Sequence, residues 1–120
     1  MICTVVDFEK DSVVYNFTGA TKEELDNHLN LFFTTENLLL KSDISEQKIF
    51  QKGNKILRII FGAFIKYFKV VVTIRSENGV FTVKLYRDMN FIMSGGIIGR
   101  TAARKEFARI NEAFKVYFGH

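Results

Sequence analysis

The stretch SGGIIGRTAARKEF, residues 94–107, is the part of this chain that looks most like a chemical motif. A Walker-type phosphate loop follows the pattern GxxxxGK[ST], in which backbone amides surround the anion and a lysine neutralises its charge. Here the spacing from Gly95 to Gly99 is one residue too short, and Arg100 stands in place of the lysine. A dinucleotide-binding fingerprint fails as well, because the strand before it belongs to a predicted hairpin and no βαβ unit follows.

We therefore interpret these glycines as a corner between a strand and a helix. Glycine permits positive φ angles and close backbone approach, so it suits a chain that swings from one element onto another. Ile97 and Ile98 are expected to fill the core beneath the corner. A weak anion site at the helix N-terminus stays open as an alternative, with Arg100 and Arg104 as its contacts.

The other reactive side chains show no spacing typical of a catalytic or metal site. His28 flanks the apolar stripe of a predicted helix, and His120 is the last residue. A metal site would have to join these two with Cys3 or with scattered carboxylates, and Ser94 lacks the GxSxG elbow of a serine hydrolase. Carboxylates that lie close together in the sequence stand in polar segments, where nothing would raise their pKa for acid catalysis. We expect a non-enzymatic protein with no catalytic residue, no metal and no cofactor.

Composition and charge indicate one globular domain spanning residues 1–120. The 48% hydrophobic and 25% charged residues are ordinary for a soluble protein that buries a core. Residues 1–45 carry 3 Lys or Arg against 8 Asp or Glu, whereas residues 46–120 carry 14 against 5. We expect the acidic front and the basic back to attract each other within one fold. A basic face for an anionic partner is the alternative.

The start of the chain predicts a cytoplasmic protein. Asp7 and the absence of a basic segment before an apolar run do not fit a secretory signal peptide. The single Cys3 can form no internal disulfide, which agrees with a reducing compartment. Export, with a signal peptide absent from this chain, is the alternative.

The first half of the chain predicts strands around one capped helix. Residues 2–8 and 12–18 are rich in β-branched and aromatic side chains. Thr21 stands three residues before Glu24, a capping box that would start a helix ending near Thr34. Apolar residues recur along this helix at helical spacing: Leu25, Leu29, Phe32 and Phe33. NLLLKS and QKIFQKG then indicate two short strands flanking a turn at residues 43–46.

Residues 69–87 predict an antiparallel hairpin closed by Asn78 and Gly79, a pair that tolerates a type I′ turn. With this turn, Glu77 pairs with Val80 and the whole register follows. The apolar face gathers Phe81 and the pairs Ile74–Val83 and Val72–Leu85; the polar face gathers Arg75–Thr82, Thr73–Lys84 and Val71–Tyr86.

Residues 100–118 predict a five-turn amphipathic helix, with an apolar stripe of Ala103, Phe107, Ile110, Phe114 and Tyr117/Phe118. A sheet with one apolar face needs a cover, and two such helices supply it. The fold class expected is α+β. We predict a two-layer sandwich in which a short N-terminal and a long C-terminal helix cover a curved antiparallel sheet of about five or six strands, a helix-grip arrangement.

The order of TKEELDNHLNLFFTT, ENLLLKSDISEQKIFQKG, the Asn-Gly hairpin and a closing helix resembles a bacterial family of unknown function. That family is described as having a TATA-box-binding-protein-like fold, β-α-β4-α. The resemblance covers residues 12–118 in pattern. It implies a fold and no activity.

The segment KILRIIFGAFIKYFK, residues 55–69, is unusually apolar. Its basic residues interrupt any window of about twenty apolar residues, so it does not span a bilayer. A buried strand bent at Gly62, a short amphipathic helix over a sheet edge, and an interfacial segment touching a membrane or a partner all remain open. Burial within the fold is the preferred interpretation.

These observations predict a binding domain. The preferred hypothesis places an apolar small molecule or a protein partner between the sheet and the C-terminal helix. The residues expected to line that space are Phe61, Phe64, Phe81, Phe107, Ile110 and Phe114.

Nucleic-acid binding through the basic sheet face, with Arg75 and Lys84 as contacts, is a less favoured alternative. The chain contains a single copy of the β-α-β4-α unit, so a saddle over a duplex would require a homodimer. Peripheral membrane or partner contact through residues 55–69 is the third hypothesis.

Overall fold

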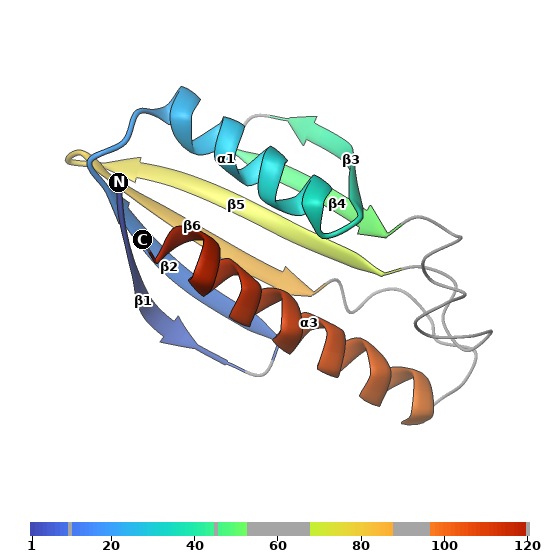
Figure 1. Cartoon of the computed structure of the whole chain (residues 1–120). Helices are drawn as coiled ribbons and strands as arrows, with labels where there is room; N and C mark the ends of the chain where they lie inside the picture. The colour runs from blue at the N-terminus through green and yellow to red at the C-terminus, as the bar shows by residue number, and fades with distance from the viewer. Residues whose placement is uncertain (10, 45, 53–67, 88–96, 120) are drawn as a thin grey trace.

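The computed structural model describes residues 1–9, 11–44, 46–52, 68–87 and 97–119. It is an α+β fold, in which a six-stranded antiparallel sheet is joined to two helices (Figure 1). The strands are β1 (Ile2–Phe8), β2 (Ser12–Thr18), β3 (Leu38–Ile44), β4 (Gln47–Lys52), β5 (Lys69–Glu77) and β6 (Val80–Arg87); the helices are α1 (Lys22–Thr35) and α3 (Ile97–Phe118).

The strands lie in the order β1-β2-β6-β5-β4-β3, with the β5–β6 hairpin at the centre. Asn78 and Gly79 have φ angles of 52° and 79°, as a type I′ turn requires. Glu77 pairs with Val80, and every cross-strand pair predicted from that turn is present. The sequence-based prediction of this hairpin is confirmed.

Helix α1 begins where the capping box predicts. The Thr21 hydroxyl accepts a hydrogen bond from the Glu24 backbone amide at 3.1 Å. That hydroxyl also donates to the Glu24 carboxylate at 3.2 Å. The Glu24 carboxylate therefore binds the Thr21 hydroxyl. The capping box predicts instead that this carboxylate accepts from a free backbone amide at the start of the helix. The helix buries the four predicted apolar residues and ends at Thr35.

Helix α3 is longer than the pattern predicts, because it begins at Ile97 and takes in three residues assigned to the glycine corner. Gly99 is thus helical, which costs only about 1 kcal/mol relative to alanine. Residues 94–96 lie outside the described part of the chain, as do residues 53–67, which contain most of the apolar segment. Phe68, near the end of that segment, is buried.

Both helices lie over the same face of the sheet (Figure 1). Alternate residues of the strands point toward them, and the helical stripes pack onto this face. The resulting cluster is largely aromatic and includes Tyr15, Phe17, Phe32, Phe33, Phe50, Phe107, Phe114 and Phe118. No helix among the described residues is long and apolar enough to cross a membrane.

Ion pairs join the acidic front of the chain to its basic back. Arg87 Nη2 lies 2.7 Å from Asp11 Oδ1. Arg109 Nη1 lies 2.6 Å from Glu36 Oε1. Lys48, in β4, also binds acidic side chains from the front. The expected attraction between the two parts of the chain is therefore seen in these contacts.

Candidate functional site

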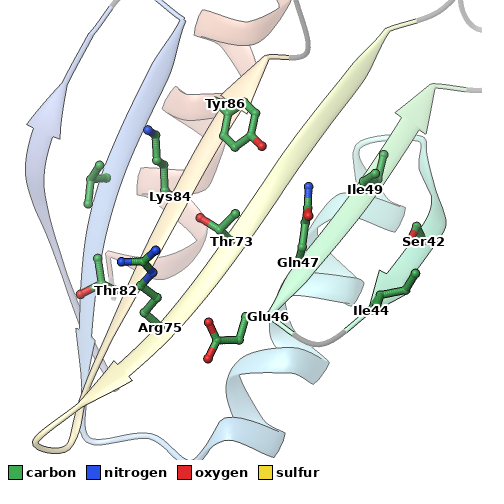
Figure 2. A pocket seen from close by; sticks show the side chains of 11 residues that line it. Ser42, Ile44, Glu46, Gln47, Ile49, Thr73, Arg75, Thr82, Lys84 and Tyr86 are labelled. Carbon is green, nitrogen blue, oxygen red and sulfur yellow. The ribbon is translucent and has the colours of Figure 1, made fainter.

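The face of the sheet turned away from the helices carries the candidate site (Figure 2). Side chains alternate along each strand, so the residues between the core positions point to this second face. Figure 2 shows them rising from neighbouring strands, with the helices behind the sheet. Strand pairing fixes one row across the sheet, in which Val14, Lys84, Thr73 and Gln47 are successive partners.

An open groove of about 970 Å³ runs over this face. Its lining mixes hydroxyl, amide, aliphatic and charged groups. The residues lining it are Val14, Ser42, Ile44, Glu46, Gln47, Ile49, Thr73, Arg75, Thr82, Lys84 and Tyr86. Such a mixture can contact both an apolar surface and a charged or hydrogen-bonding one.

Two cations of the groove are exposed and have no ion-pair partner among the described residues. Arg75 and Lys84 lie diagonally across the β5–β6 hairpin, because Arg75 pairs with Thr82 and Lys84 with Thr73. Lys84 Nζ lies 5.6 Å from the centre of the Tyr86 ring, a cation–π contact. Cations that have no carboxylate partner are available to an anionic ligand. The sequence-based prediction had placed Arg75 and Lys84 on this face.

The other two predicted anion contacts belong to α3. Arg104 is exposed on this helix, which covers the opposite face of the sheet from the groove (Figure 1). Arg100 lies in the first turn of the same helix. The four cations therefore do not form one surface: Arg75 and Lys84 share the groove, whereas Arg104 lies on the helical side.

Four of the six residues predicted to line an apolar container lie in the core. Phe81, Phe107, Ile110 and Phe114 are all buried. The Phe114 ring centre lies 4.4 Å from that of Tyr15, and further rings from α1, β2 and α3 surround it. Side chains fill this part of the space between the sheet and α3.

Two further residues of that hypothesis, Phe61 and Phe64, lie outside the described residues, and the container stays a prediction. The apolar segment of residues 55–69, proposed to contact a membrane or a partner, lies almost wholly outside them too.

A buried charge cluster links β4, α1 and α3, and the sequence pattern did not reveal it. Lys52 Nζ lies 2.9 Å from Glu106 Oε2 and donates to the Glu36 backbone carbonyl at 2.8 Å. Arg109 binds Glu106 through two nitrogens, at 2.7 and 2.8 Å. Burial alone would raise the pKa of Glu106, but the hydrogen bonds from Arg109 and Lys52 outweigh it and lower that pKa. The cluster ties the helices to the sheet and is a structural feature.

Cys3 and His28 have separate environments. His28 Nδ1 lies 2.9 Å from the Tyr117 hydroxyl. Burial raises the pKa of the Cys3 thiol to about 11, and Cys3 packs against the core. In the described part of the chain, no group of three His, Cys, Asp or Glu side chains could hold a metal ion.

The raised thiol pKa gives a first prediction. Because the pKa of Cys3 lies about two units above the ordinary value, roughly a hundredfold less thiolate is present at pH 8. A thiolate of higher pKa is a stronger nucleophile, and this compensates for about tenfold of the lost rate. We expect iodoacetamide to alkylate folded Cys3 about tenfold more slowly than the same protein in urea, measured by mass spectrometry. Equal rates in the two states would contradict the burial of this thiol.

Comparison with known proteins adds no assignment to this geometry. No model of a protein family matches the chain, and no curated protein matches it significantly.

Proposed function

We propose that this protein is a non-enzymatic binding domain that holds single-stranded nucleic acid on the open face of its sheet. The observation that carries the proposal is the pair of exposed cations Arg75 and Lys84, which have no ion-pair partner among the described residues and lie beside Tyr86 in a groove that no described helix covers. The net charge of +4 also favours a polyanionic partner.

The chemistry of the groove matches what single strands offer. Phosphates bind lysine and arginine, and bases stack on aromatic rings, with about 1–3 kcal/mol per stacked base. Arg75 and Lys84 supply the cations and Tyr86 supplies one ring. Gln47 and Thr73 supply hydrogen-bonding groups between them, and their neighbours in the groove add aliphatic contact. A duplex would need a longer face, which a homodimer would supply.

We also propose that the chain adopts the two-layer, TATA-box-binding-protein-like arrangement that its sequence resembles. From β2 to α3 the described elements follow the order strand, helix, four strands, helix. This order agrees with β-α-β4-α, and β1 adds a strand at the edge next to β2. The fold alone does not imply nucleic-acid binding.

The test is binding of a fluorescently labelled 15-nucleotide single strand, followed by polarisation at several salt concentrations. Two phosphate contacts predict a slope of log affinity against log salt of about −1.4. Replacing both Arg75 and Lys84 with glutamine is expected to flatten that slope and to weaken binding about tenfold or more. Tyr86→Leu is expected to cost about 1–3 kcal/mol at every salt concentration.

The matched control replaces Arg104 and Lys105, two exposed cations of α3, with glutamine. It removes the same charge from the opposite side of the sheet and is expected to leave binding nearly unchanged. Absence of binding by the unaltered protein at low salt would refute the proposal. Loss of binding in the control variant alone would move the site to the helical side.

A further inference from the structure

Arg87, the last residue of β6, is a buried cation with too few partners. Its side chain points to the helix-covered face and is 0% exposed. Nη2 donates to Asp11 Oδ1 at 2.7 Å. Nε and Nη1 are buried and have no hydrogen-bond partner among the residues that the structure describes. One carboxylate oxygen thus accepts from a guanidinium that has five N–H groups to donate.

The other buried cations on this face are better satisfied. Lys48 has carboxylates of both Asp26 and Asp43 within 4 Å, at 3.9 and 2.8 Å. Lys52 has a carboxylate and a backbone carbonyl. A buried N–H without a partner costs about 1–3 kcal/mol, and more when the group is charged. Arg87 therefore has a deficit of negative charge and of acceptors that the described residues do not fill.

We propose that Arg87 is the anchor of a buried site for a small oxyanion, namely the phosphate or carboxylate group of a ligand. An oxygen of such a group would satisfy Nε, whereas Nη1 lies on another edge of the planar guanidinium and would need a second acceptor. The Asp11 side chain is 34% exposed, so a ligand would have to approach Arg87 from this side of the ion pair. This site is separate from the groove, because Arg87 lies on the other face of the sheet from Arg75 and Lys84.

Thermal unfolding in phosphate, in acetate and in chloride at matched ionic strength tests the site. A ligand that binds only the folded state raises the melting temperature with the logarithm of its concentration. We expect phosphate or acetate to stabilise the protein beyond the chloride series, and the effective anion identifies the group. Arg87→Met should abolish the stabilisation beyond chloride, and Arg75→Met should keep it. Arg87→Met should still bind the oligonucleotide.

Asp11→Asn separates an anion site from an arginine that only supports the fold. Removing the competing carboxylate should make the effective anion bind about tenfold more tightly, and that anion should restore the stability that the substitution loses. A variant destabilised to the same extent in all three salts would overturn the proposal.

Nuclear magnetic resonance of the unaltered protein tests the site without relying on a variant that folds. The Nε–H signal of Arg87 should shift as phosphate or acetate is added, and the Nε–H signal of Arg109, held by Glu106, should not. An Arg87 signal that is insensitive to both anions shows that water satisfies the guanidinium, and the proposal then fails.

Discussion

Phe114→Ala is expected to lower the free energy of unfolding by about 3–5 kcal/mol. The ring is fully buried and contacts rings from α1, β2 and α3, at centre distances from 4.4 Å for Tyr15 and Phe118 to 5.2 Å for Phe32. Truncation removes those contacts and leaves a cavity that the surrounding rings cannot close. Urea denaturation followed by circular dichroism measures the change.

Val116→Ala is the matched control, because Val116 lies on the same helix and is 65% exposed. It should change the stability by no more than about 0.5 kcal/mol. The cavity in the Phe114→Ala protein should be apolar, so benzene should stabilise the variant and leave the unaltered protein unchanged. A loss below about 1 kcal/mol would indicate a loose interior and would favour the container hypothesis over a packed core.

The elements that the sequence predicts well are those encoded by neighbouring residues. The capping residue Thr21 and the stripe from Leu25 to Phe33 define α1 over a few turns. The Asn78–Gly79 turn fixes the register of the central hairpin, because a slip of one residue would turn every side chain to the wrong face. The start of α3 was predicted too late, since glycine suggested a corner although it is also tolerated within a helix.

Half of the candidate groove follows from that hairpin register. The register alone predicts that Arg75, Lys84 and Tyr86 share one face. The other half comes from β2, β3, β4 and the turn between β3 and β4. Gln47 and Ile49 of β4 are brought to the groove by the pairing of β4 with β5. Nothing in the local pattern determines that pairing.

Buried charges are still less predictable. Lys48, Lys52 and Arg87 occupy core positions that an alternating pattern assigns to apolar residues. The carboxylates of Lys52 and Arg87 come from distant parts of the chain, so only the folded structure explains why burying these cations is tolerated.

Glu106→Leu tests the most buried of these contacts and is also expected to cost about 3–5 kcal/mol, because it leaves Lys52 buried without its carboxylate. The unpaired positive charge left on Lys52 is expected to lower the stability more than the loss of the hydrogen bonds does. Combining it with Lys52→Met should recover most of the stability, since an apolar pair of similar size needs no counter-charge. Urea denaturation of the two single variants and the double variant gives the coupling energy as a double-mutant cycle. Additive single effects would show that the two side chains do not interact.

The same pair makes the stability depend on pH in a defined direction. The pKa of Glu106 is lowered in the folded protein, so the unfolded chain takes up this proton more readily. The contribution of Glu106 is therefore fully present above the unfolded pKa of about 4.3 and is lost as the pH falls through the lower, folded value. Between pH 7 and pH 3 the unaltered protein should lose more stability than the Lys52→Met/Glu106→Leu variant, which lacks this carboxyl group. Parallel curves for the two proteins would place the acid sensitivity in other carboxylates.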